Sequence, residues 1–227
     1  AVGYAAMQNC TTGEYNVAVG HAALDAVLTG DYNVALGTSA LSANTDGIYN
    51  TASGYSVMAV NSSGTRNAAF GAFALDANTT ASYNTAIGHA ALSANTTGAN
   101  NVGYASLDAV TTSSGNTAVG TSALGATTDT GNTAVGYNAG RDNAGGAYNV
   151  AVGYESLLVN TSGVYNVAIG NNALDANLTG GNNVAVGRLA LSASTVSNNV
   201  AVGSYAAAAT TTGHSNVAVG TNAMLVA

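Results

Sequence analysis

The sequence contains no proline and no tryptophan, and only 6% of its 227 residues are charged. Its three cations are all arginine and its net charge is −7, so it lacks the basic surface that nucleic acids or anionic membranes require. The single cysteine, Cys10, excludes a disulfide within one chain. No apolar run approaches the roughly 20 residues of a membrane-spanning helix. We therefore expect neither nucleic acid as a partner nor insertion into a membrane.

A glycine-ended motif recurs throughout the chain. The segment Tyr15-Asn16-Val17-Ala18-Val19-Gly20 returns at intervals of 15 to 17 residues. A period of this size is one supersecondary unit per copy, and 47% hydrophobic residues in register can fill a core, which disfavours disorder. We predict a single continuous repeat array over residues 1–227. Because the chain begins inside a motif, at Ala1-Val2-Gly3, we expect it to be part of a longer fibrous protein.

The residues before each motif glycine alternate with a period of two, which predicts a β-strand. Polar segments such as Asn95-Thr96-Thr97-Gly98 suit the turns between strands. We predict an all-β fold, a parallel β-solenoid (β-roll) of about thirteen coils with a period of about 17 residues, stacked ~4.7–4.9 Å apart. An alternative interpretation makes residues 22–26 a helical turn, since Ala and Leu favour helices.

Shortened repeats predict which part of a coil can vary. Between Gly88 and Gly103 two residues are missing, and we assign the loss to the strand, because removing a pair keeps every side chain on its face. Single residues are missing before Gly136 and Gly203, and we assign these losses to the turns over residues 127–131 and 194–197. Gly140 stands where Leu is expected, which predicts a locally thinner core.

Two columns of large apolar residues are predicted to line the core. One is the residue directly before each glycine, and the other is the fourth residue after it. The core ladder comprises Val19, Leu36, Ile87, Val119, Val152, Ile169 and Val186 in the first column, and Leu24, Leu41, Leu92 and Leu174 in the second. Each buried side chain of this kind contributes roughly 1.5–3 kcal/mol.

The alanine two places before each glycine is never polar, although alternation places it opposite the first apolar column. This column includes Ala18, Ala35, Ala151, Ala168 and Ala185. Small residues in register let another backbone approach closely, so we interpret the column as a face between identical chains. The alternative is a coil interior so narrow that it admits only alanine.

Two polar or aromatic columns precede the strands. Stacking of the coils predicts an amide ladder of the kind that stabilises cross-β structures. Its members include Asn16, Asn33, Asn50, Asn149, Asn166 and Asn183. Tyr15, Tyr32 and Tyr49 lie just before this ladder and are candidates for glycan contact. We favour a corner spine held by ring packing for these tyrosines.

The sequence predicts no catalytic residue, no cofactor and no metal site. Asp25, Asp76, Asp108 and Asp175 share a column but never occupy adjacent coils, which separates their charges rather than pairing them for acid–base chemistry. The glycines form no phosphate-binding loop. Glycosylation acceptor motifs begin at Asn61, Asn78, Asn95, Asn160 and Asn177. An Asn/Thr-rich turn produces such matches by composition, so we treat them as incidental.

The unit Asn-x-Ala-Val/Ile-Gly-x-x-Ala-Leu, joined by connectors of the type Asn-Thr-Thr-Gly-x-Tyr, resembles the head repeats of YadA-like trimeric autotransporter adhesins. It is also similar to the Asn-Thr-Ala-Val-Gly-Tyr repeats of bacteriophage tail fibres. The resemblance covers the entire chain. It implies a homotrimeric, parallel β-solenoid rod or head, displayed extracellularly on a cell or a virion.

On this basis we expect a non-catalytic structural or adhesive segment, a shaft or head that provides reach, rigidity and receptor presentation. Its expected partners are copies of itself and a cell-surface glycan or receptor. Two alternatives are an ice-binding β-solenoid, suggested by the low charge, the regular spacing and the abundant Thr, and a glycan-binding repeat surface that uses the Tyr ladder.

Overall fold

The computed structural model describes residues 1–26, 29–107 and 109–225, which form short β-strands and contain no helix. The chain divides into two compact units, Ala1–Gly115 and Asn116–Ala227, and the same type of coil repeats in each. The predicted all-β parallel β-solenoid with a period of about 17 residues is confirmed, and the helical interpretation of residues 22–26 is wrong.

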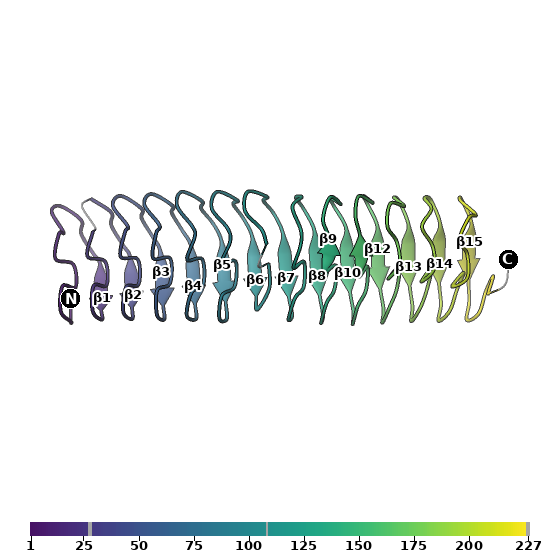
Figure 1. Ribbon diagram of the computed structural model, residues 1–227, viewed down its shortest axis with the longest axis horizontal. Coiled ribbons are helices and arrows are strands. Elements are labelled where there is room, and N and C mark those ends of the chain that lie inside the picture. The colour runs from purple at the N-terminus through teal and green to yellow at the C-terminus, as the bar shows by residue number, and fades with distance from the viewer. Residues whose placement is uncertain (27–28, 108, 226–227) are drawn as a thin grey trace. The chain divides into compact units, whose positions relative to one another are not determined.

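In the first unit, consecutive strands pair in parallel, each with the next in the sequence (Figure 1). The register aligns equivalent residues, so that Ala18 lies beside Ala35 and Val19 beside Leu36. The strands are β1 (Val17–Val19), β2 (Val34–Leu36), β3 (Thr51–Ser53), β4 (Ala68–Phe70), β5 (Thr85–Ile87) and β6 (Val102–Tyr104).

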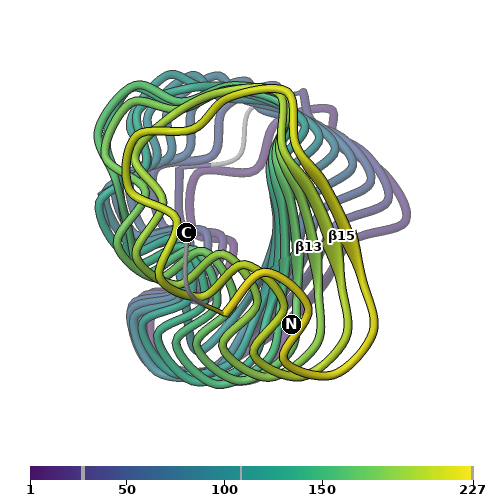
Figure 2. The ribbon, with the colours of Figure 1, turned by 90° about the vertical axis from the view of Figure 1, so that its right-hand side faces the viewer.

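The second unit repeats this arrangement and adds a small second sheet. Its main sheet has the order β7 (Thr117–Val119), β8 (Thr133–Val135), β10 (Val150–Val152), β12 (Val167–Ile169), β13 (Val184–Val186), β14 (Val200–Val202) and β15 (Val217–Val219). On the return path of the coil, β9 (Asp142–Asn143) pairs in parallel with β11 (Val159–Asn160). Figure 2 looks along the coils and shows the strand side at β13 and β15, with the return path bent several times.

Left-handed backbone conformations produce these bends. In the second coil, Tyr32, Ser39 and Leu41 have φ angles of 57°, 56° and 52°, and the corresponding columns repeat the pattern. Each such residue costs roughly 1–2 kcal/mol when it is not glycine. The corner glycine after the strand is required for a second reason, because a Cβ at Gly20 would lie 2.5 Å from the carbonyl oxygen of Gly37.

The core contradicts one of the two predicted core columns. Leu24, Leu41, Leu92 and Leu174 are fully buried, as expected. The first column points outward, and its members in the predicted ladder are half-buried or exposed, with Val19 42% and Ile169 39% exposed. The outward members are Val19, Leu36, Ile87, Val119, Val152, Ile169 and Val186.

The alanine column lies inside instead, which corrects its interpretation as a face between chains. Ala18, Ala35, Ala151, Ala168 and Ala185 are at most 1% exposed within the single chain. This column holds alanine because the interior of the coil is narrow, and the leucines of the return path reach the inner side of the sheet. At Gly140, in the leucine column, an added Cβ would lie 3.9 Å from the Cβ atoms of both Ala134 and Ala151. Only a methyl group fits opposite leucine, so the alternative interpretation holds.

The two-residue deletion also lies elsewhere than predicted. Gly103 pairs with Ala86 and Tyr104 with Ile87, so β6 keeps its full length and Gly103 occupies the alanine column. Leu92 N–H bonds to the carbonyl of Ser106, and Leu107 takes the place of the inner leucine. The missing residues are therefore the corner glycine and its successor. A Cβ at Gly103 would lie 3.1 Å from Leu92 Cγ, which explains glycine at this shortened corner.

Gly140 keeps the backbone bend of the leucine column, with φ of 58°. Leu124 Cδ2 lies 3.0 Å from the position that a Cβ of residue 140 would occupy, so a neighbouring leucine fills part of the space.

The two single-residue losses lie in the turns, as predicted. The N–H groups of Asn132 and Asn199 each donate their ladder bond across 16 residues instead of 17, to Asn116 and Asn183.

Candidate functional site

The predicted asparagine ladder is present, and its bonds join side chains to backbone as well as side chains to each other. Asn33 N–H donates to Asn16 Oδ1 at 2.8 Å, and the next coil repeats the bond between Asn50 and Asn33. In addition, Asn33 Nδ2 donates to the carbonyl of Gly47 at 2.8 Å. The ladder therefore connects neighbouring coils and fastens the strand entrance to the turn. The same bonds link Asn149, Asn166 and Asn183 in the second unit.

A second amide ladder, which sequence reasoning missed, lies inside the turns. Its members are Asn44, Asn61, Asn78 and Asn95 in the first unit, and Asn143, Asn160 and Asn177 in the second; all are 0% exposed. Asn61 Nδ2 donates to Asn44 Oδ1 at 2.7 Å and to the carbonyl of Gly64 at 3.1 Å. That carbonyl also accepts a bond from Asn50 Nδ2, so the two ladders meet at one oxygen in each regular turn.

Burial of the inner ladder settles the meaning of the glycosylation motifs. The five acceptor asparagines identified from the sequence are all members of this ladder. An Asn side chain with no exposed surface and a bonded amide nitrogen cannot carry a glycan in the folded protein. The signal that marks the ladder in the sequence is the recurrence of Asn three residues before a turn glycine.

The threonines that suggested ice binding are engaged in the solenoid. Thr79 Oγ1 donates to the carbonyl of Thr96 at 3.3 Å, and Thr96 Oγ1 donates to that of Thr111 at 3.0 Å. In the second unit Thr161 Oγ1 donates to the carbonyl of Leu178 at 2.8 Å. These hydroxyls bond to the next coil, so they do not form a free hydroxyl array.

Exposed aromatic rings form a line on the first unit, which we call the tyrosine stack: Tyr15, Tyr32, Tyr49, Arg66 and Tyr83. Tyr15 and Tyr32 are 4.8 Å apart between ring centres, and Tyr32 and Tyr49 are 4.9 Å apart, with interplanar angles of 8° and 6°. Both faces of Tyr32 are thus covered by its neighbours. A sugar cannot lie flat on such a ring, so the stack presents ring edges and hydroxyl groups. The ring packing is that of a corner spine.

Each unit also carries a flat outer face, made by the strand residues on either side of the buried alanine. In the second unit it consists of Thr117, Val119, Thr133, Val135, Val150, Val152, Val167, Ile169, Val184, Val186, Val200, Val202, Val217 and Val219. In the first unit it consists of Val17, Val19, Val34, Leu36, Thr51, Ser53, Ala68, Phe70, Thr85, Ile87, Val102 and Tyr104. Neither face contains a charged residue, and contiguous apolar surface of this kind marks interaction sites.

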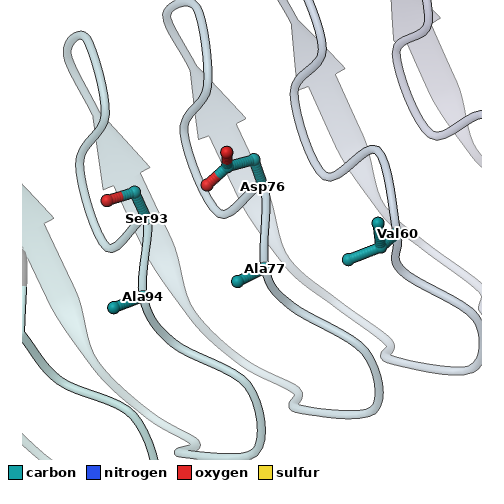
Figure 3. A pocket seen from close by; sticks show the side chains of 5 residues that line it. All are labelled: Val60, Asp76, Ala77, Ser93 and Ala94. Atoms are coloured by element: carbon teal, nitrogen blue, oxygen red, sulfur yellow. The ribbon is translucent and has the colours of Figure 1, made fainter.

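A shallow groove runs along the return path of the first unit and is lined by Val60, Asp76, Ala77, Ser93 and Ala94. Figure 3 shows these side chains on successive coils, with Asp76 in the middle. Burial raises the pKa of the Asp76 carboxyl, and it does the same for Asp175 in the second unit. Asp76, Asp25 and Asp175 sit on separated coils, and Asp108 lies outside the described residues. The groove brings no second acid beside Asp76 for acid–base chemistry.

One ion pair is present among the described residues. Arg141 Nε and Nη2 donate to the two carboxylate oxygens of Asp142 at 2.9 and 2.6 Å. The hydrogen bond from Arg141 lowers the pKa of Asp142. Nearby, Glu155 accepts bonds from Asn138 and Asn172 on the neighbouring coils, both at 3.4 Å. The arrangement stabilises the coil surface.

Within the described parts of the chain, no group of three or more His, Cys, Asp or Glu side chains is placed to hold a metal ion. The same residues contain no helix that is long and apolar enough to span a bilayer. The sequence matches no protein-family model, and no curated protein or solved structure is significantly similar to it. The candidate surfaces are therefore the two outer faces and the tyrosine stack.

Proposed function

We propose that the chain is a non-catalytic structural or adhesive segment of an extracellular or virion fibre, and that identical copies assemble through their outer faces into a homotrimer. The segment acts as a shaft or head that provides reach and rigidity. The observation that carries the proposal is the combination of a coil interior joined by repeated hydrogen bonds with an uncharged apolar outer face in each unit.

The interior supports a mechanical role. Two amide ladders, a hydroxyl ladder and the strand pairing join neighbouring regular coils within a unit. Repeats that are connected in this way resist local opening, because removing one coil from the stack breaks all four sets of bonds. Stiffness and resistance to proteolysis are what a fibre segment requires.

The outer faces support assembly with copies of the same chain. The first unit offers 12 outward residues from six strands and the second unit 14 from seven, 26 in all, and an interface of standard size uses roughly 20–30 residues a side. An identical chain has the same spacing between coils, so its side chains can follow these columns in register. Because neither column carries a charge, the net charge of −7 lies away from the contact.

The test is the mass of the protein in solution together with one charged substitution. We expect a trimer for the wild-type chain, measured by light scattering after size-exclusion chromatography. Ile169→Glu places a carboxylate on the outer face and should dissociate the assembly without loss of β-structure in circular dichroism. Thr179→Glu adds the same charge at an exposed turn and should leave the mass unchanged.

A monomeric wild-type protein would contradict the assembly, and so would an Ile169→Glu variant of unchanged mass. The ice-binding alternative stays a prediction, although the hydroxyls of Thr79 and Thr96 are bonded to the next coil. A thermal-hysteresis measurement on the same samples checks it, and we expect no ice shaping.

A further inference from the structure

Arg66 occupies the one position in the tyrosine stack that is cationic. Its Cζ atom lies 5.3 Å from the ring centre of Tyr49 and 5.5 Å from that of Tyr83. Arg66 Nη1 donates to the Tyr83 hydroxyl at 3.2 Å. Tyr49 and Tyr83 thus flank the guanidinium along the column, its other N–H groups have no described hydrogen-bond partner, and Arg66 is exposed.

No carboxylate neutralises this cation. Within the described residues, no Asp or Glu oxygen lies within 4.0 Å of the Arg66 guanidinium. The adjoining column has Thr65 and Ser82 beside Arg66, and their hydroxyls bond to each other at 3.2 Å. The acidic residues of this column, Glu14 and Asp31, lie three and two coils from Thr65 toward the N-terminus. Two coils correspond to ~9–10 Å, about one Debye length, so their repulsion of an anion is screened.

We propose that Arg66 and the flanking tyrosine hydroxyls bind the carboxylate and adjacent hydroxyls of a terminal acidic sugar, such as a uronic acid. The guanidinium edge matches a carboxylate with two parallel hydrogen bonds. The contacts with Tyr49 and Tyr83 hold the guanidinium in place before the ligand arrives, which reduces the ordering cost of binding. Tyrosine hydroxyls on both sides supply partners for the sugar hydroxyls.

The geometry favours a ligand that approaches edge-on and carries one charge. Neighbours cover both faces of Tyr32, and Arg66 lies over Tyr49 and Tyr83, which disfavours a sugar stacked flat on the rings beside this cation. A single arginine in a chain with a net charge of −7 does not suit a polyanion. The site lies within one chain, so sugar binding does not depend on the proposed assembly. Only its role in attachment to a cell surface rests on the proposed adhesive function.

The test is a titration of the full chain, followed by NMR chemical shifts, with sodium glucuronate, glucose and acetate. We expect saturable binding of glucuronate, no saturation with glucose, and clearly weaker binding of acetate. Arg66→Gln should weaken glucuronate binding by about tenfold or more, equivalent to roughly 1.4 kcal/mol. Arg66→Lys keeps the charge but loses the planar fork and should weaken it as well. Tyr83→Phe, which removes one hydroxyl, should cause a smaller loss.

The matched control is Arg188→Gln in the second unit. Arg188 also stacks on a tyrosine, with Cζ 5.0 Å from the ring centre of Tyr205, but this is its one described ring contact. We expect this variant to bind glucuronate like the wild type. Thermal unfolding by circular dichroism confirms that each variant is folded.

Unchanged binding in Arg66→Gln, or no saturation with glucuronate, overturns the proposal. Equal affinity for acetate and glucuronate also overturns it, because the hydroxyls would then contribute nothing. Solution mass separates this failure from that of the proposed assembly. Loss of sugar binding in a variant of wild-type mass concerns the Arg66 site alone, whereas a monomeric wild-type chain that binds glucuronate contradicts only the assembly.

Discussion

Individual residues are selected here mainly by the backbone conformation that each column imposes. The tyrosine column has φ near 57°, and where tyrosine is absent most positions hold asparagine or glycine, with Arg66 and Ser215 as the exceptions; these positions are Asn100, Gly115, Gly131, Asn182 and Asn198. Asparagine and glycine are the residues that adopt left-handed conformations at least cost. The corner column is stricter still, since a side chain there would collide with the next coil.

Substitution of a corner glycine should therefore be severe. In Gly170→Ala the new Cβ would lie 2.5 Å from the carbonyl oxygen of Gly187, at a φ of 134°. We expect a loss of about 3 kcal/mol or more in the free energy of unfolding, measured with urea. Gly125→Ala is the control, because its Cβ would lie 3.4 Å from the nearest atom, Ser122 O. It should change stability by less than about 1 kcal/mol; equal effects would contradict the steric explanation.

The inner amides should also be individually critical. Asn61→Ala removes the bond to Asn44 Oδ1 and the bond that Asn61 Oδ1 accepts from Asn78 Nδ2, both 2.7 Å. Because it leaves buried groups without partners and creates a cavity, we expect a loss of about 3 kcal/mol in thermal or urea unfolding. The exposed turn substitution Thr80→Ala should stay within about 0.5 kcal/mol. A cost for Asn61→Ala as small as this would show that the ladder contributes little.

Asp76 and Asp142 should respond to pH with opposite signs. Burial raises the pKa of Asp76 above its ordinary 3.8, so its stabilising contribution is present below that pH and is lost as the pH rises through the folded-state pKa. Asp76→Asn should therefore raise the melting temperature at pH 7 and not at pH 3. The pKa of Asp142 is lowered by Arg141, so its contribution is lost on acidification. Asp142→Asn should lower the melting temperature at pH 7 only, and the same sign for both variants would refute this assignment.

At the scale of the strand and turn, ladders explain both stability and its local defects. Val110 interrupts the inner amide ladder in the column after Asn95, and the buried Asn95 Oδ1 has no hydrogen-bond partner. The ladder ends similarly at Asn177, where Ser194 follows in a shortened turn. Such ends leave a polar atom desolvated, which costs about 1–3 kcal/mol.

This defect predicts an unusual response to Val110→Thr. Threonine has nearly the shape of valine, and its hydroxyl can donate to Asn95 Oδ1. We expect the free energy of unfolding to stay within about 0.5 kcal/mol of the wild type or to increase. Val57→Thr, at an equally buried position with no orphaned acceptor described in its column, should lose about 1–3 kcal/mol. Equal losses in urea unfolding would contradict the role assigned to Asn95.

The sequence predicts the solenoid, its period and the turns, because these follow from the repeat itself. It does not predict which side of a three-residue strand faces inward. Alternation gives two faces, and the larger residues, such as Val19, are normally the buried ones. Here the leucines of the return path fill the interior. How far they reach into it depends on the left-handed bends at positions such as Ser39 and Leu41, which periodicity does not reveal. The inner asparagines are missed for a related reason, since polar turn residues ordinarily face solvent.

At the scale of the whole molecule, stability should grow coil by coil, as in other linear repeats. Deletion of residues 154–170 removes one complete coil from the second unit and joins Gly153 to Asn171 in register. We expect a folded protein with the same circular dichroism spectrum per residue and a modestly lower melting temperature. Deletion of residues 154–169 leaves an extra residue at the corner and should cost much more. Equal melting temperatures for the two deletions would contradict a fixed register.

The clamped amides of the inner ladder have a consequence for the chemical lifetime of the protein. Asparagine normally ages by deamidation, which requires its side-chain carbonyl carbon to swing toward the following backbone nitrogen. In Asn61 and Asn160 the amide is held by bonds to the adjacent coil and to its own turn, without contact with bulk water. The asparagines of the inner ladder are thereby protected from this route of spontaneous decay for as long as the coils remain closed.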